Sequence, residues 1–345
     1  MADRAEVRPA IVATTSYVPS VRMTPEAAAR ICATPLAGPA EARMQSVYAD
    51  TLRWRNAAME ACPARHDTGA LQVAGRFVPS VAVETALGVS DMALLVARRL
   101  VRAQPSPEAR QPDQIIVCQG SFEHALTLSC ACRLQCELGG ARSPIAIGQL
   151  QGASFLMALQ VTRAMMRSDP GMQYVLLVAA ERWRPPFART VGPLTALGDG
   201  AAAVLVSRSV RSGWQLEALA VRTPTSGDAS CAVHVGVDPA MLVAVIEECC
   251  AQVWLQPSAV DRVLPACIDA ELTREISARC GLPLWRNRDA QLASCGYLGT
   301  ADTPVQLDGL LRATTPEHGQ RILIWSAGLE KQVACALLRY TEGES

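Results

Sequence analysis

The chain has 345 residues, half of them hydrophobic, with 32 acidic and 32 basic side chains. This length and apolar content allow a large buried core, in two domains or in one duplicated unit. The zero net charge predicts no long-range attraction to nucleic acid or to anionic membranes. No apolar run reaches the roughly 18 residues needed to cross a bilayer, and residues 1–10 lack the apolar core of a signal peptide. We therefore expect a soluble cytoplasmic protein without nucleic-acid or membrane partners.

Thirteen cysteines raise the possibility of a metal site, but their spacing does not favour one. Cys130 and Cys132 make a C-x-C pair, and Cys249 and Cys250 are adjacent, whereas zinc sites typically use two matched C-x-x-C pairs. In a cytoplasmic chain such thiols are expected to be reduced and mostly buried as small apolar side chains. We predict no metal and no other resident cofactor.

Strand-length apolar runs alternate with helical patterns through the first half of the chain. Gln114–Cys118 follows a Pro-Asp turn and is rich in β-branched residues, which is typical of a buried strand. Residues 121–138 place Leu and Ala at helical spacing and end at Gly139-Gly140, so a helix is expected there. Further strands are predicted at 145–147, 174–180 and 201–207, with a helix at 152–167.

The second half of the chain repeats this order. Strands are predicted at 263–265, 321–325 and 333–339, and helices at 270–280 and 302–311. The strands at 174–178 and 201–206 correspond to those at 321–325 and 333–338. Strand–helix alternation predicts an α/β protein with mostly parallel sheets covered by helices, and the repeat predicts two packed halves. We place these halves at residues 1–210 and 211–345, with the boundary near Ser207–Ser212.

Several motifs in order along the chain resemble one known family. Ala10–Pro19 resembles its opening strand and Tyr-Leu-Pro turn, and Leu197–Ala203 is close to its Phe-Gly-Asp-Gly-Ala-Gly-Ala motif. Leu264-Pro265 and Gly296 match the residues before its His and Asn motifs. From Ile11 to Tyr340 the chain is thus similar to ketoacyl synthase III of the thiolase superfamily. The resemblance implies a five-layered α-β-α-β-α fold built from two duplicated halves, and a dimer.

The family's reaction uses a Cys, a His and an Asn. The Cys sits at a sharp strand-to-helix turn and takes an acyl group from CoA or a carrier protein, while His and Asn stabilise an enolate. In this chain the Cys position falls on Gly152, because Gly152–Phe155 lines up with Cys-Ala-Gly-Phe, although a gap would place Gln151 there. The His position is Ala266 and the Asn position is Tyr297. All three positions of the triad are therefore replaced.

The absence of the Cys does not depend on the alignment, because no Cys lies between Cys136 and Cys231. Four other residues near the expected cavity could substitute, and each has a simpler structural interpretation. Ser154 could act as a seryl nucleophile, or replace a packing glycine. Cys267 and Cys295 flank the vacated His and Asn positions, or are merely two buried thiols. Asp269 could act as a base, or simply end a strand.

Further residues could line the cavity. His124 begins the predicted helix after the first core strand, where packing competes with catalysis as an explanation. Tyr297 could partly fill the cavity or donate a hydrogen bond to a ligand carbonyl. Gly328 lies in Ala327–Glu330, which replaces the family's Gly-rich loop. Trp183 could face an acyl chain or pack on its own domain. Three arginines could bind pantetheine or CoA phosphates, or be solvated, namely Arg182, Arg184 and Arg189.

These residues predict a ketoacyl synthase III-like protein that binds acyl thioesters, on CoA or an acyl carrier protein, in specialised polyketide or fatty-acid-type biosynthesis. Standard Cys-dependent decarboxylative condensation is excluded. One hypothesis is a catalytically degenerate subunit, in a homodimer or in a heterodimer with a Cys-containing ketosynthase. The other is an unconventional acyltransferase or condensing enzyme that uses the same cavity without the triad. In both, the ligand is CoA or a phosphopantetheine-borne acyl group.

Overall fold

The computed structural model describes residues 7–32, 80–123, 128–140, 142–184, 189–191, 194–208, 212–224, 236–283 and 294–342. Their central feature is a nine-stranded sheet in the order β11-β12-β13-β10-β1-β9-β6-β4-β5. These strands are β1 (Ala10–Tyr17), β4 (Gln114–Gln119), β5 (Ile145–Gly148), β6 (Tyr174–Glu181), β9 (Gly200–Ser207), β10 (Gly213–Arg222), β11 (Arg262–Pro265), β12 (Arg321–Ala327) and β13 (Val333–Thr341). Two short pairs lie outside it, β2 (Arg22–Met23) with β3 (Val81–Ala82), and β7 (Thr190–Val191) with β8 (Thr195–Ala196).

The sheet consists of two parts with the same strand pattern. In the first part β4, β5 and β6 are parallel, and β9 runs antiparallel to both β6 and β1. In the second part β11 and β12 are parallel, and β13 runs antiparallel to both β12 and β10. The parts join only at the ends of β1 and β10, where Ala10 faces Gln215 and Ile11 faces Trp214. The duplication is therefore confirmed, although each part is a mixed sheet. Residues 209–211 lie outside the described ranges, so the boundary at 210/211 stays a prediction.

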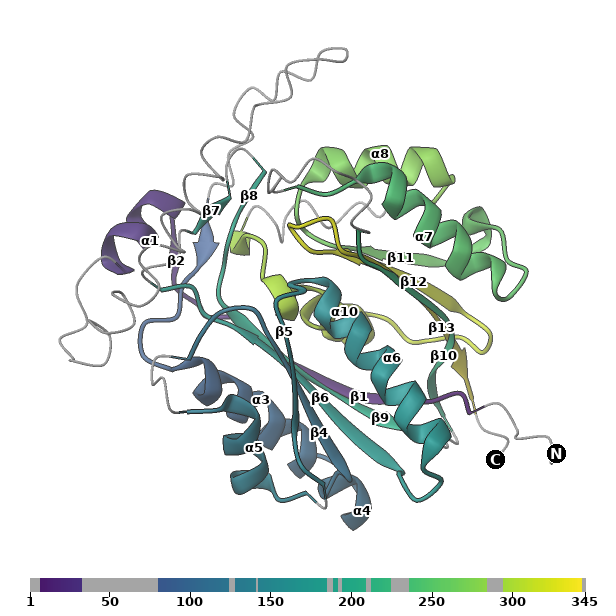
Figure 1. Ribbon diagram of the computed structural model, residues 1–345, viewed down its shortest axis with the longest axis horizontal. Coiled ribbons are helices and arrows are strands. Elements are labelled where there is room, and N and C mark those ends of the chain that lie inside the picture. Colours follow the sequence, from purple (N-terminus) through teal and green to yellow (C-terminus); the bar gives the residue numbers. More distant parts are fainter. Residues whose placement is uncertain are drawn as a thin grey trace.

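Helices lie on both sides of each part of the sheet and between the two parts (Figure 1). The first part is covered by α3 (Val89–Arg102), α4 (Pro107–Arg110) and α5 (Cys130–Leu138), and the second by α7 (Pro239–Ala251) and α8 (Ala270–Cys280). The central layer holds α6 (Ala153–Ser168) and α10 (Asp302–Ala313). The remaining helices are α1 (Pro25–Cys32), η1 (Pro257–Ala259) and η2 (Gly299–Ala301). This is the predicted five-layered α-β-α-β-α arrangement.

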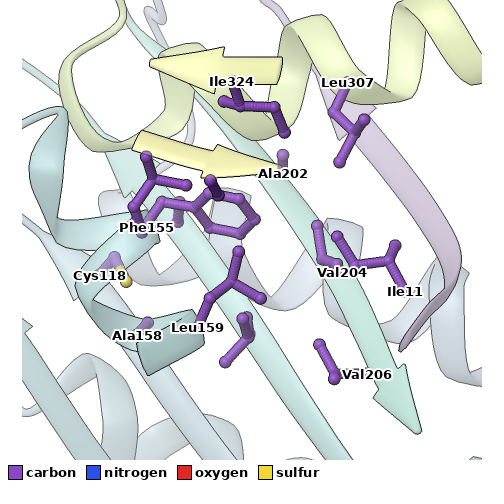
Figure 2. Packing of buried hydrophobic residues seen from close by; sticks show 14 of the residues in the cluster. Ile11, Cys118, Phe155, Ala158, Leu159, Ala202, Val204, Val206, Leu307 and Ile324 are labelled. Atoms are coloured by element: carbon purple, nitrogen blue, oxygen red, sulfur yellow. The ribbon is translucent and has the colours of Figure 1, made fainter. Parts of the chain in front are cut away.

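The central layer is apolar because both of its faces meet a sheet. One cluster joins Phe155 and Leu159 of α6 with Leu307 of α10, Val204 of β9 and Ile324 of β12 (Figure 2). Burying each such side chain stabilises the fold by about 1.5–3 kcal/mol relative to leaving it exposed. This packing fixes where α6 begins, and hence where the turn before it lies.

The helix expected at 121–138 begins later than predicted. In the structure α5 starts at Cys130, with the Ser129 hydroxyl accepting a hydrogen bond from the Cys132 N–H as its N-cap (3.3 Å). The N–H groups of Gly120 and Ser121 instead donate to the buried carboxylate of Glu181 (2.9 and 2.6 Å). A partner distant in sequence therefore overrides the helical pattern at residue 121, and residues 124–127 lie outside the described part of the chain.

A fully buried ion pair supports the loop between β6 and β9. Arg189 donates two hydrogen bonds to Asp199, at 2.9 Å to Oδ1 and 2.8 Å to Oδ2, and both side chains are almost completely inaccessible. The Asp199 carboxylate also accepts the N–H groups of Glu84 and Trp183 (both 2.8 Å). Asp199 belongs to the Leu-Gly-Asp-Gly motif that carried the family resemblance, so that motif is a structural anchor here.

Replacing Arg189 with Ala should lower the free energy of unfolding by about 3–5 kcal/mol, because it leaves a buried carboxylate without its counter-charge. The control is Arg98→Ala, which breaks an exposed ion pair with Glu137 and should cost about 0–1 kcal/mol. Denaturant unfolding of both variants measures the difference. Equal losses in the two variants would show that the Arg189–Asp199 pair has no special role.

Candidate functional site

The turn between β5 and α6 has a strained backbone. Gln149 and Gln151 both have positive φ angles, +65° and +47°, which residues other than glycine rarely adopt. Gly152 has ordinary right-handed helical angles, φ −55° and ψ −30°, and caps α6. The apex of this strand-to-helix turn is therefore Gln151, the position that a gap in the sequence comparison would assign to the nucleophile.

The backbone angles of Gly152 would suit any residue. Glycine is required there because no space is left for a side chain. A Cβ atom on residue 152 would lie 2.2 Å from the Tyr297 hydroxyl, 2.7 Å from the Ala327 carbonyl oxygen and 2.7 Å from Ser326 Oγ. These separations are far below van der Waals contact. Two of the three vacated positions thus meet in space, because the side chain of Tyr297 fills the volume next to Gly152.

Tyr297 is completely buried and held at both ends. Its hydroxyl donates a hydrogen bond to the Ala327 carbonyl (2.9 Å), and its backbone N–H donates to Ala196 (2.8 Å). Burial raises the pKa of Tyr297 well above its usual value, and the nearby Asp302 and Glu181 act in the same direction. The phenol therefore stays neutral and occupies the space beside Gly152, while its role toward a ligand stays a prediction.

The side chain of Gln151 reaches the loop after β12. Its Oε1 accepts a hydrogen bond from the Leu329 N–H at 2.7 Å, and the side chain is buried. The loop comes very close to the turn, since a Cβ on Gly328 would lie 2.8 Å from the Leu150 carbonyl oxygen and 2.5 Å from Gln332 Oε1. Gly328, predicted to line the cavity, thus allows the loop to lie close against the turn.

The residues around the former His position have structural roles. Ala266 is buried in the core of the second half, together with Tyr297. The thiol of Cys267 is also buried, and the Cys267 N–H donates to Asp302 Oδ2 (2.9 Å). Asp269 caps α8, its Oδ1 accepting the N–H groups of Glu271 and Leu272 (both 2.8 Å). Because Asp269 Oδ1 caps the helix, a structural role for Asp269 is favoured over a role as a catalytic base.

The other candidate nucleophiles differ in their surroundings. Ser154 is fully buried in the first turn of α6, and among the described residues its hydroxyl has no hydrogen-bond partner. Cys295 is buried next to Arg22, whose guanidinium donates to the sulfur at 3.5 Å. His124 lies outside the described residues. Among the described residues, no group of three His, Cys, Asp or Glu side chains could hold a metal ion.

Two of the three arginines proposed for phosphate binding turn inward, contrary to both interpretations made from sequence. Arg182 is buried and donates to the Glu84 carbonyl through Nε and Nη2 (3.3 and 3.1 Å), while Arg189 pairs with Asp199. Trp183 is buried in the core of the second half. Arg184 is half-buried. The Arg-Trp-Arg segment therefore packs against its own chain, but Trp183, from the first half, lies in the core of the second half and not in that of its own domain.

Sequence reasoning missed Glu181, a fully buried carboxylate at the end of β6. It accepts the N–H groups of Gly120, Ser121 and Thr300 at 2.9, 2.6 and 3.2 Å. Burial raises the pKa of Glu181 and outweighs these hydrogen bonds, which favour the charged form. An acidic residue directly after a wholly apolar strand was the available signal.

Gly152→Ala should destabilise the protein by about 1–3 kcal/mol through overpacking against Tyr297. Tyr297→Phe should cost a similar amount, about 1–3 kcal/mol, because the buried Ala327 carbonyl loses its donor. The double variant should lose less than the sum, since Phe removes the atom nearest to the new methyl group. Gly309→Ala on α10 is the control, because a Cβ there meets nothing within 4 Å. Strict additivity in this cycle would contradict the close packing.

Glu181 and Glu84 should affect the pH dependence of stability in opposite directions. The raised pKa of Glu181 means that its contribution is full below the unfolded pKa, about 4.3, and is lost as pH rises through the folded value. For Glu84, burial raises the pKa, but hydrogen bonds from Tyr17, Leu87 and Ala86 lower it overall, so its contribution is lost as pH falls. Unfolding of Glu181→Gln and Glu84→Gln from pH 3 to 7 should give differences from wild type of opposite slope, and slopes of the same sign would refute the assignment.

Comparison with known proteins supports the fold assignment. Residues 149–227, from the turn before α6 into the loop after β10, match the family model described as 3-oxoacyl-[acyl-carrier-protein (ACP)] synthase III. A sequence search of curated proteins finds no match.

Solved structures share the fold over nearly the whole chain. ChlB3, described as an acyltransferase, has 19% identity and a TM-score of 0.71, covering 97% of this chain and 98% of that one. The 3-oxoacyl-[acyl-carrier-protein] synthase III of Aquifex aeolicus VF5 has 19% identity and a TM-score of 0.66, covering 96% and 100%. A Glu-to-Gln variant of Xanthomonas campestris OleA has 15% identity and a TM-score of 0.66, covering 97% and 98%. The resemblance to ketoacyl synthase III is therefore confirmed, in fold along nearly the whole chain and in sequence over residues 149–227.

Proposed function

We propose that this chain is a catalytically degenerate ketoacyl synthase III-like subunit. It binds acyl thioesters on CoA or an acyl carrier protein, in the cytoplasm, as part of a specialised polyketide or fatty-acid-type pathway. It does not carry out Cys-dependent decarboxylative condensation. One observation carries this proposal: the Tyr297 hydroxyl occupies the space in which any side chain on residue 152 would begin.

Cys267 and Ser154 do not replace the missing nucleophile. A reactive thiol or hydroxyl needs a base, a positive environment or solvent access. Cys267 is buried beside the carboxylate of Asp302, and Ser154 is fully buried. Ala266 and Tyr297 also leave no imidazole or carboxamide where the family's enolate is stabilised. These arrangements support a binding role over a covalent one.

Acyl thioesters as ligands are supported by the shared fold. A Cys-to-Ser variant of Xanthomonas campestris OleA was solved with lauric acid and lauroyl-CoA, and that structure matches 97% of this chain with a TM-score of 0.67. The bound acyl ligands therefore belong to a form of OleA that has lost one of its cysteines. We take long-chain acyl-CoA as the first ligand to test for this chain.

The edge of the sheet supports a partner subunit. Strand β5 is the last strand of the nine and pairs with β4 along one side. An open strand edge is a template for pairing with another chain. We propose that a second copy, or a Cys-containing ketosynthase, adds its own strand there and continues the sheet.

The likeness to ChlB3, described as an acyltransferase, favours a second candidate function. In that case the chain would hold an acyl thioester and an acceptor together and accelerate direct transfer between them. Orientation alone can contribute much of such a rate enhancement. This candidate requires no covalent intermediate, and so does not need residue 152.

Incubation with lauroyl-CoA, followed by intact mass measurement, tests the proposal. No lauroyl adduct should form, while a Cys-containing ketoacyl synthase III treated in parallel should gain one. An adduct on Cys267, Cys295 or Ser154 would refute the degenerate-subunit proposal. Acyl transfer to an added acceptor without an adduct would favour the second candidate.

A further inference from the structure

We infer that Gln151 is an internal ligand, whose carboxamide takes the place that the carbonyl of a bound acyl group would occupy. The inference rests on the proposed acyl-thioester binding, and adds how access of the acyl group to this site is controlled. It concerns one side chain and its contact with the loop after β12. Binding of the acyl carbonyl then requires this carboxamide to move away.

The backbone of the turn points to Gln151. Its φ of +47° is strained for a residue with a side chain, and Gln149 two residues earlier has a φ of +65°. Such strain costs of order 1–3 kcal/mol per residue and persists only where surrounding contacts enforce it. The turn is held by hydrogen bonds from Ala153 N–H to Leu150 (3.1 Å) and from Ser154 N–H to Gln151 (2.9 Å). From this turn the Gln151 side chain reaches Leu329 in the loop after β12.

The carboxamide of Gln151 has the bond pattern of an acylated cysteine. In both side chains the carbonyl carbon follows Cβ and one further atom, a methylene carbon in Gln and a sulfur in the thioester. Both end in a planar carbonyl whose oxygen accepts hydrogen bonds. The Gln151 oxygen has such a donor, the Leu329 N–H at 2.7 Å. An acyl carbonyl brought to this turn would need the same N–H.

A second contact keeps the loop close to the turn. The Tyr297 hydroxyl donates to the Ala327 carbonyl, two residues before Leu329 (2.9 Å). Gly328 between them allows the approach to Leu150 that a side chain would prevent. The Leu329 N–H is thus fixed toward Gln151. Its hydrogen bond is made to a side chain of the same protein, and not to a ligand.

The contact should weaken binding of acylated ligands and leave free CoA unaffected. Breaking a buried hydrogen bond costs enough to reduce affinity by about tenfold or more. We expect Gln151→Ala to bind lauroyl-CoA about tenfold more tightly than wild type, because the Leu329 N–H becomes available. Affinity for CoA without an acyl group should be equal in the two proteins. Isothermal titration with both ligands measures this.

Two further variants make the test specific. Gln104→Ala removes another buried glutamine, one that donates to Leu100 within the outer layer (2.9 Å), and should change neither affinity. Gln151→Asn keeps the amide but shortens the side chain, so it should behave like Gln151→Ala, and it replaces that variant should Gln151→Ala fail to fold. Hydrogen exchange at the Leu329 amide should be faster in both Gln151 variants without ligand.

The outcomes separate this inference from the proposed function. Equal affinity of wild type and Gln151→Ala for lauroyl-CoA overturns the inference while leaving acyl-thioester binding intact. Binding by Gln151→Ala but not by wild type supports the internal ligand and overturns acyl-thioester binding as the activity of the native chain. An equal gain in affinity for free CoA also overturns the inference, and absence of binding in every variant overturns both.

Discussion

The close approach of the Tyr297 ring to the start of α6 is the constraint on which the site depends. The hydroxyl lies where a side chain on residue 152 would begin, so residue 152 can only be glycine. The same hydroxyl is tied to Ala327, which brings the end of β12 against the turn before α6. Because α6 lies between the two parts of the sheet, this contact links both halves at the centre of the molecule. The identities of residues 152 and 297 therefore constrain each other.

Much of the fold could be predicted from the sequence because it follows local periodicity. Buried strands such as 174–180 and helices such as 270–280 carry their own pattern, and α8 begins at Ala270 and ends before Gly281 as predicted. The repeated strand order follows from comparing the two halves. The mixed direction of the strands could not be predicted, because an apolar segment gives no information on whether the neighbouring strand is parallel or antiparallel.

The sequence predicted which residue types are missing from the site, but not which residues contact one another there. The lack of a Cys near residue 152 and of a His after Pro265 follows from reading the chain. The burial of Arg182 and Arg189 does not, since their partners, the Glu84 carbonyl and the Asp199 carboxylate, are known only from the structure. Glu181 was missed for the same reason, because its three N–H donors come from residues 120, 121 and 300. Long-range polar contacts decide such residues, and no local pattern encodes them.

The polar character of the filled site distinguishes two explanations for it. A cavity that had simply been filled would hold apolar side chains, since an unsatisfied buried hydroxyl or amide costs about 1–3 kcal/mol. Here the volume beside Gly152 contains a phenol and the Ser326 hydroxyl, which has no hydrogen-bond partner among the described residues, and Ser154 nearby is in the same state. The turn also keeps its strain at Gln149 and Gln151. Strained backbone and unsatisfied polar groups are characteristic of a site that meets a ligand. This combination favours a site that meets a ligand over one that became ordinary core.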